Sequence, residues 1–436
     1  MKAAAAVLLA VQAAFSITLE EAVSIALSSR GDVGAAWSGY ESASWQRRSA
    51  GLWFLPRVSA SGSLVRNHDI QEMEIPGMGS FPVGSEYSSS VGLTAAVPLF
   101  TASGIAGAGL ARSAETLAMY NAIASEQDAV LQVASAFYGV LLAEELSDVA
   151  REALDIAEQG YALAEQRYAA GTISRFELLQ SRVAYETRIP EAISAAFGVE
   201  NAKSSLAVAL GLPDSTGLDP EGSLDDPVPV AADVGSIEEA REVMLARSPD
   251  LAVADGMREV GAGGLRLAAA SFAPTVMFQA SYGFLAQGDD WRFDPEDYDR
   301  SWTSMISVQI PIFDGLSDVA GYNSARSDML SSAWRARSLE QYCGLRLTEA
   351  CNALEEARRM VEATASTVSQ AEEGAEIASV SYEAGVITRL DMDQAFLALT
   401  AARTNHASAL YSLRMAEAGL ARAMGVLALE QRGEDE

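Results

Sequence analysis

Two groups of side chains that can form ion pairs recur in the two halves of this 436-residue chain. Each group combines a tyrosine, a glycine, an arginine and a carboxylate, and the second follows the first at a constant spacing of 214 residues. The residues are Tyr168, Gly171, Arg175 and Glu177 in the first half, and Tyr382, Gly385, Arg389 and Asp391 in the second. Arginine beside a carboxylate forms charge-assisted hydrogen bonds, so the chemistry that these groups predict is reversible ion pairing.

Side chains for covalent chemistry or metal binding are scarce. The two histidines, His68 and His406, have no further ligands at metal-binding spacing around them. The glycine-rich runs at 104–109 and 261–264 match neither a phosphate loop nor a dinucleotide fingerprint. The sequence therefore predicts no catalytic residue, no metal site and no cofactor, and the chain is not expected to be an enzyme.

The charge balance excludes one class of partner. The chain has a formal net charge of −29 and its only lysines are Lys2 and Lys203. Nucleic-acid binding depends on clustered Lys and Arg side chains that contact phosphates. We therefore expect no nucleic-acid partner.

The two groups occupy sites that are typical of tight turns between helices. A glycine ends the preceding helix, a Ser or Thr three residues later caps the next helix, and a carboxylate three residues further completes a capping box. These positions are Gly171, Ser174 and Glu177 in the first turn, and Gly385, Thr388 and Asp391 in the second. One interpretation is that these residues only shape the turns. The other is that the carboxylates of several chains meet at a rim that ion pairs hold shut.

Long helices are expected to carry the turns. Residues 101–170 and 315–384 contain no proline, and each would form a helix of roughly 105 Å. Apolar residues within 142–168 follow two neighbouring seams, so the first long helix can pack against a partner on each side. This pattern favours the wall of a helical tube over the alternative, a four-helix bundle in a monomer.

Strands are expected near the start of each half. Residues 55–98 and 274–312 each contain two segments in which apolar and polar residues tend to alternate, a pattern that is a weak signature of transmembrane β-strands. Four aromatic residues near the strand ends fit a membrane interface: Tyr87, Tyr282, Phe284 and Trp302. Four strands cannot close a membrane barrel alone. The strands are therefore either part of a soluble sheet or shared among several chains in one barrel.

An internal two-fold repeat organises the chain. Residues 17–211 and 237–426 each contain an opening helix, a β-hairpin, a long helix, a tip turn and a return helix. The tip turns are 171–174 and 385–388. A connector rich in proline and glycine, 212–236, is expected to form an irregular equatorial segment between the repeats.

The two ends of the chain are expected to lie outside the repeats. Residues 1–16 combine a cationic start, an apolar stretch and small residues, which predicts a signal peptide that is cleaved near Ile17. Residues 427–436 form an acidic C-terminal tail. The signal peptide predicts export from the cytoplasm.

Taken together, these features resemble the TolC family of outer-membrane efflux proteins. The resemblance rests on the duplicated turn, on the strand ends at 97–100 and 310–313, and on the closing Ala-Leu-Gly and Ala-Met-Gly. It implies a mainly α fold with transmembrane β-strands. In this fold a homotrimer combines four strands per chain into a 12-stranded outer-membrane β-barrel, which a long periplasmic α-helical barrel continues.

The resemblance also implies partners and site residues. The partners would be outer-membrane lipid, a periplasmic adaptor (membrane fusion protein) and an inner-membrane pump. The adaptor-contact turns would be formed by Tyr168, Gly171, Ser174, Tyr382, Gly385 and Thr388. The periplasmic aperture would be lined by Arg175, Glu177, Arg389 and Asp391.

The expected function is a passive exit duct in the outer membrane, part of a tripartite efflux or type I secretion system. The alternative is a periplasmic coiled-coil adaptor or scaffold of an envelope transport complex, because such proteins also contain long helical hairpins. The duplicated strand pairs argue against that alternative.

Overall fold

The computed structural model describes residues 15–77, 79–214, 218–228 and 236–427. Residues 1–14 of the expected signal peptide and 428–436 of the expected acidic tail lie outside these ranges. The chain divides into two compact units. The helical unit contains residues 1–39, 119–254 and 337–436, and the sheet unit contains residues 40–118 and 255–336.

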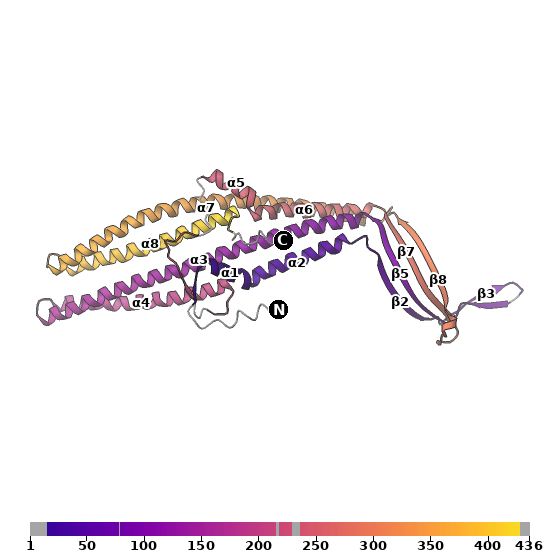
Figure 1. Ribbon diagram of the computed structural model, residues 1–436, viewed down its shortest axis with the longest axis horizontal. Helices are drawn as coiled ribbons and strands as arrows, with labels where there is room; N and C mark the ends of the chain where they lie inside the picture. Colours follow the sequence, from indigo (N-terminus) through magenta and orange to yellow (C-terminus); the bar gives the residue numbers. More distant parts are fainter. Residues whose placement is uncertain (1–14, 78, 215–217, 229–235, 428–436) are drawn as a thin grey trace. The chain divides into compact units, whose positions relative to one another are not determined.

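Helices account for most of the described chain (Figure 1). They are α1 (Leu19–Ser29), α2 (Gly31–Gly51), α3 (Ala102–Ala169), α4 (Arg175–Leu210), α5 (Ile237–Arg247), α6 (Pro249–Ala269), α7 (Ser317–Glu383) and α8 (Arg389–Met424). The strands are β1 (Phe15–Ile17), β2 (Arg57–Arg66), β3 (Gln71–Ile75), β4 (Gly79–Val83), β5 (Tyr87–Thr101), β6 (Leu218–Pro220), β7 (Thr275–Gly288) and β8 (Asp299–Gln309).

Each opening helix is broken in two, which differs from the single helix expected in each repeat. Arg30 separates α1 from α2 with extended backbone angles, φ −69° and ψ 128°. Ser248 separates α5 from α6 in the same way. The second break has a direct sequence cause, because Pro249 disfavours helical geometry at the residue before it.

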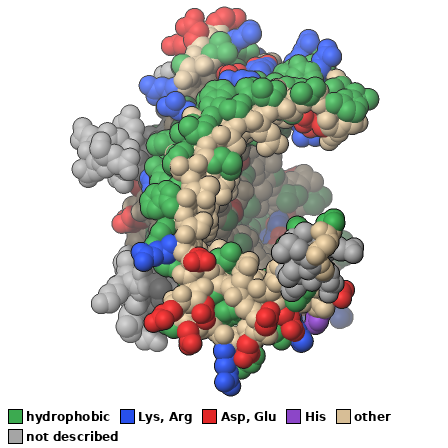
Figure 2. Space-filling view, turned by 90° about the vertical axis from the view of Figure 1, so that its right-hand side faces the viewer, with side chains coloured by type: hydrophobic (Ala, Val, Ile, Leu, Met, Phe, Trp, Pro, Cys, Tyr) green, Lys and Arg blue, Asp and Glu red, His purple; other side chains and the backbone are tan. Residues whose placement is uncertain are grey.

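The sheet unit is built on four antiparallel strands in the order β2-β5-β7-β8. The register places Ala60 opposite Leu93, Leu93 opposite Tyr282, and Tyr282 opposite Trp302. Directly opposite residues share a face of a sheet, so one apolar row crosses all four strands. The ring centroids of Tyr282 and Trp302 are 5.8 Å apart, and those of Tyr282 and Phe284 are 5.3 Å apart. Figure 2 faces the end of the chain that Figure 1 draws on its right, where the strands lie, and shows hydrophobic side chains gathered in a band.

Residues 55–98 hold one more hairpin than the sequence pattern predicted. Strands β3 and β4, which follow β2 and precede β5 in the sequence, form a separate two-stranded sheet, with Met73 opposite Phe81. Gly77 and Gly79, with φ values of 90° and 87°, form the turn between them. Figure 1 shows this hairpin extending beyond the four-stranded sheet. The pattern did not reveal this hairpin, because β4 has only five residues and Pro82 within it is atypical of a strand interior.

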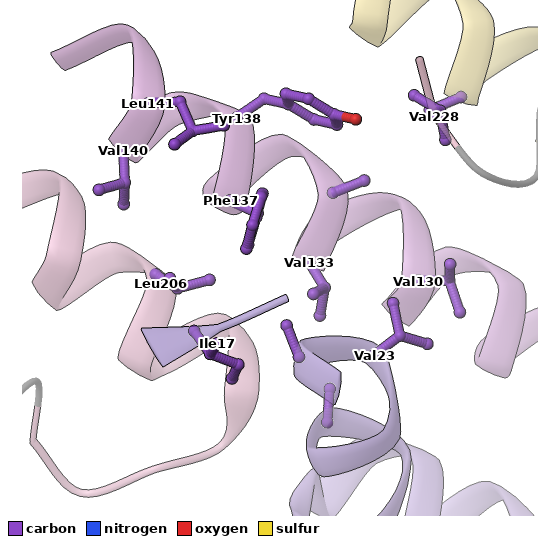
Figure 3. Packing of buried hydrophobic residues seen from close by; sticks show 14 of the residues in the cluster. Ile17, Val23, Val130, Val133, Phe137, Tyr138, Val140, Leu141, Leu206 and Val228 are labelled. Atoms are coloured by element: carbon purple, nitrogen blue, oxygen red, sulfur yellow. The ribbon is translucent and has the colours of Figure 1, made fainter. Parts of the chain in front are cut away.

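The helical unit is held together by a core of small and aliphatic side chains (Figure 3). Val133 and Phe137 of α3 pack with Val23 of α1 and Leu206 of α4, and all four are at most 3% exposed. A second cluster joins α5, α7 and the end of α8, around Met244, Leu347 and Met424. Burial of apolar surface from several segments is what stabilises the hairpins against one another.

The connector segment 218–228 is irregular apart from one short strand, and specific contacts hold it against the helical unit. Its strand β6 pairs with β1. The buried guanidinium of Arg414 in α8 donates to the carbonyl oxygens of Leu224 and Asp225, both at 2.9 Å. Tyr138 of α3 donates to the Asp226 carbonyl at 3.3 Å, and burial raises the pKa of Tyr138 to about 12.

One apolar stretch of α3 is comparable to a membrane-crossing helix by length and composition. An 18-residue window of this helix has a mean hydropathy of 1.4, and 44% of that window is buried inside the protein. Buried core helices of soluble proteins reach the same length and hydropathy, so this stretch also fits a helix in the core of the helical unit.

Candidate functional site

The first tip turn joins α3 to α4 through glycine and a capping box. Gly171 has φ +75°, a left-handed conformation that strains residues with a side chain. The amide of Glu177 donates to Ser174 Oγ at 3.2 Å, and the amide of Ser174 donates to Glu177 Oε2 at 3.4 Å. The helix therefore begins at Arg175 with reciprocal caps.

The second tip turn joins α7 to α8 with matching geometry. Gly385 also has φ +75°. Thr388 donates to Asp391 Oδ2 from its amide at 2.9 Å and from its hydroxyl at 2.6 Å, and the Asp391 amide donates back to Thr388 Oγ1 at 3.3 Å. These hydrogen bonds lower the pKa of Asp391. Both predicted aperture carboxylates, Glu177 and Asp391, thus also cap the first turn of a helix.

Arg389 is the most buried charged residue at the tips. Its side chain is 8% exposed, and its Nε donates to Asp393 Oδ1 at 2.8 Å. A methyl group on Gly160 of α3 would lie 2.5 Å from Arg389 Nη2, so the guanidinium packs in a notch at this glycine and would have to shift if residue 160 carried a side chain. Burial raises the pKa of Asp393, an effect that the charge of Arg389 partly opposes.

Two guanidinium groups, one from each helical hairpin, lie against the ring of Tyr382. The Cζ atom of Arg389 lies 5.8 Å from the centre of the Tyr382 ring, and that of Arg167, at the end of α3, lies 4.9 Å from it. A cation within about 6 Å of an aromatic ring centre is attracted to the ring. The tip of the α7–α8 hairpin is therefore tied to the tip of the α3–α4 hairpin.

A salt-bridge network repeats this link further along the hairpins. Arg403 of α8 contacts Glu152 of α3 at 2.5 Å and Glu372 of α7 at 2.9 Å. One arginine thus bridges three helices. Figure 1 shows the two hairpins, α3–α4 and α7–α8, running side by side.

The two tips are not equivalent, although their sequences match. Arg175, which aligns with Arg389, is exposed and makes no hydrogen bond, ion pair or ring contact with any residue that the structure describes. Tyr168, which aligns with Tyr382, is 43% exposed. The structure therefore brings Tyr382 and Arg389 together and leaves Tyr168 and Arg175 open on the surface.

Three residues at this site were missed by sequence reasoning: Gly160, Arg167 and Asp393. The spacing of Asp393 four residues after Arg389 on one helix is the signal that predicts their pairing. No local signal identifies Gly160 or Arg167, because both reach the site from another hairpin. No group of three metal-ligating side chains occurs in the described ranges.

Comparisons with known proteins agree with this fold. The family profile described as "Outer membrane efflux protein" matches residues 22–212 and again 241–426. No curated protein sequence matches the chain significantly.

Several solved structures share the fold at low sequence identity. The outer-membrane protein VceC from Vibrio cholerae is 18% identical, with a TM-score of 0.78 and coverage of 94% of this chain and 96% of that one. The CmeC outer-membrane channel of Campylobacter jejuni is 16% identical, with a TM-score of 0.80 and coverage of 95% and 87%. The MtrE outer-membrane channel of Neisseria gonorrhoeae is 21% identical, with a TM-score of 0.78 and coverage of 93% and 88%.

The family match spans most of the chain and confirms the resemblance drawn from its repeated turns, strand ends and closing glycines. The chain therefore belongs to the outer membrane efflux protein family, the TolC-like proteins of the outer membrane.

Proposed function

We propose that this protein is the outer-membrane exit duct of a tripartite efflux or type I secretion system. Three copies would form it, and it would passively conduct substrate that an inner-membrane pump delivers through a periplasmic adaptor. The observation that carries the proposal is a sheet of four strands with two open edges, in a chain of the outer membrane efflux protein family.

The open edges of the sheet would need to pair with strands of further copies of the chain. Strands β2 and β8 lie at the two ends of the sheet order, so each has one row of backbone groups without a strand partner among the described residues. Lipid cannot satisfy such groups, so membrane strands occur only in closed barrels. In the proposed trimer β8 of one copy pairs with β2 of the next, which gives a closed barrel of twelve strands.

Apolar side chains on α4 support the same assembly. They are separated by three, four, ten and four residues, which places them on one face of the helix, and they remain exposed in the single chain: Phe176, Leu179, Val183, Ile193 and Phe197. Spacing of this kind forms a seam for a neighbouring helix. In the trimer, this seam would pack against the next copy and close the helical tunnel.

The two-fold repeat would be a duplication that supplies both halves of each wall segment. The family profile matches the chain twice, and Gly211 and Gly425 end the two return helices with φ values of 74° and 78°. Within this repeat, the connector 212–236 would form the equatorial segment.

The tip turns are proposed to contact the adaptor and to line the aperture. Adaptor contacts would use Tyr168, Gly171, Ser174, Tyr382, Gly385 and Thr388, and the aperture would use Arg175, Glu177, Arg389 and Asp391. Because Arg389 and Tyr382 are held by the chain's own residues, the first-repeat turn would offer the more accessible tyrosine and arginine. The six turns of a trimer would therefore alternate between two kinds of contact surface.

The membrane interface is proposed to lie at the aromatic side chains of the sheet. Tyr282, Phe284 and Trp302 form one contact group, in which Trp302 is 74% exposed. Tyr87 lies on β5, with the guanidinium of Arg66 5.3 Å from its ring. Aromatic rings with one polar edge favour the boundary between lipid and water.

Cell fractionation followed by native mass spectrometry of the detergent-purified protein tests this function. The expected result is an outer-membrane assembly with three times the mass of the mature chain. A monomer recovered from the soluble periplasm would contradict the proposal and favour the adaptor or scaffold alternative.

A further inference from the structure

The start of the chain contains two places where an exported protein could lose its signal peptide. Cleavage sites of this kind have compact residues one and three positions before the cut. Ala14 and Ser16 meet this requirement for a cut before Ile17, and Val11 and Ala13 meet it for a cut before Ala14. A cut before Phe15 would place the larger Gln12 three positions upstream. Sequence reasoning selected the cut before Ile17.

The fold uses the two residues that this cut would remove. Phe15–Ile17 forms strand β1, which pairs in parallel with Leu218–Pro220 of the connector. The hydroxyl of Ser16 donates to the carboxylate of Glu221, and the amide of Glu221 donates to the Ile17 carbonyl at 2.9 Å. Removing Phe15 and Ser16 would leave the connector strand with a single partner residue.

Ile17 is unsuited to be the first residue of the mature chain. Its side chain is 2% exposed and belongs to the core cluster of the helical unit, beside α1, α3 and α4 (Figure 3). A cut before Ile17 would place a charged ammonium group on the backbone nitrogen of this buried residue. Burying a charge carries a free-energy cost even where a carboxylate, here that of Glu221, lies near it.

We infer that the chain is processed between Ala13 and Ala14, three residues before the expected position. In this reaction a peptidase of the export pathway hydrolyses the peptide bond between the two alanines. The elements of water leave a carboxylate on Ala13 of the released peptide and an ammonium on Ala14 of the mature chain. The mature protein keeps all of β1, with one residue before it to carry the charge. The inference rests on the proposed export to the outer membrane.

The experiment is N-terminal sequencing and intact-mass measurement of the full chain expressed in a Gram-negative host and purified from the outer membrane. The expected N-terminus is Ala14. A mature chain that starts at Ile17, or at any residue after Phe15, would overturn the inference.

Two matched substitutions locate the cut independently of folding, because processing is scored on total cell protein. Ala13→Leu places a large side chain directly before the inferred cut, so cleavage at Ala14 should be lost and the uncut precursor should accumulate. Ser16→Leu does the same for the alternative cut, and the chain should still start at Ala14. The reverse pattern, with Ser16→Leu blocking processing and Ala13→Leu tolerated, would overturn the inference.

The same samples separate this inference from the proposed function. A trimer in the outer membrane that starts at Ile17 would overturn the cleavage position and leave the duct intact. An uncut wild-type chain that stays in the cytoplasm or the inner membrane would overturn both.

Discussion

Gly160 and Arg389 fit together across two helical hairpins: a methyl group on Gly160 would lie 2.5 Å from Nη2 of the arginine. Gly160 belongs to α3 and Arg389 is the first residue of α8. The contact joins the α3–α4 and α7–α8 hairpins next to the tip turns, where the proposed duct would have its periplasmic mouth.

Gly160→Ala is expected to lose the stabilisation that this substitution normally brings to a helix. Alanine in place of a helical glycine stabilises by roughly 0.5–1 kcal/mol, but here its methyl group would displace the Arg389 guanidinium. Gly139→Ala in the same helix is the control, because a methyl group there meets no atom within 4 Å. Thermal unfolding of the purified protein should show a higher midpoint than wild type for Gly139→Ala and no such rise for Gly160→Ala. Equal gains would show that the notch does not constrain the arginine.

Arg389→Ala and Arg175→Ala should differ in their effects, although the residues align in sequence. Removing Arg389 deprives the half-buried Asp393, whose side chain is 35% exposed, of its ion-pair partner, which should cost about 1 kcal/mol. Arg175 has no described partner, so its removal should change the free energy of unfolding by no more than a typical surface substitution, about 0.5 kcal/mol. Calorimetry of both variants measures the difference. Similar losses would refute the inequality of the two tips.

The same pair of variants also tests the proposed adaptor surface. Because Arg175 is exposed, Arg175→Ala should weaken binding of a co-purified adaptor without lowering stability. Unchanged adaptor binding, measured by surface plasmon resonance, would remove Arg175 from that surface.

The tips also show what sequence could and could not predict. Each capping box lies within four residues, so local chemistry sufficed to predict Ser174 with Glu177 and Thr388 with Asp391. The unequal burial of the two arginines depends on Gly160 and Arg167, which approach from another hairpin, and no local pattern encodes that approach.

The strands repeat this lesson. The main sheet followed from alternation over about ten residues, and the register then brought Tyr282 and Trp302 into contact. Strands β1 and β6, with three residues each, are too short to show a period. Their pairing depends on the connector returning to the start of the chain, which is why the expected cleavage position fell inside β1.

The cap of α8 should make stability depend on pH. Hydrogen bonds from Thr388 lower the pKa of Asp391 below 3.8 in the folded protein. A carboxylate with a lowered folded pKa stabilises the fold above its unfolded pKa, and this contribution is lost as the pH falls through the folded pKa. The difference in unfolding midpoint between wild type and Thr388→Val should therefore be full near neutral pH and shrink below about pH 4. A difference that stays constant with pH would show that the carboxylate adds nothing to the cap.

Replacing both aperture carboxylates should open the resting duct. If Glu177 and Asp391 of three chains meet near one axis with arginines, their removal breaks the ion pairs that hold the mouth shut. The Glu177→Ala, Asp391→Ala double variant should therefore show a higher closed-state conductance than wild type in planar lipid bilayers. The matched control is Ser174→Ala with Thr388→Ala, which removes the caps but keeps the carboxylates. Equal conductance of wild type and the double variant would leave Glu177 and Asp391 with the capping role alone.

Conductance of the purified wild-type assembly in planar lipid bilayers tests the central claim most directly. The account predicts discrete pores that pass cations in preference to anions, because the chain carries a net charge of −29. Folded, membrane-inserted protein that shows no conductance would contradict the claim that this protein is an exit duct.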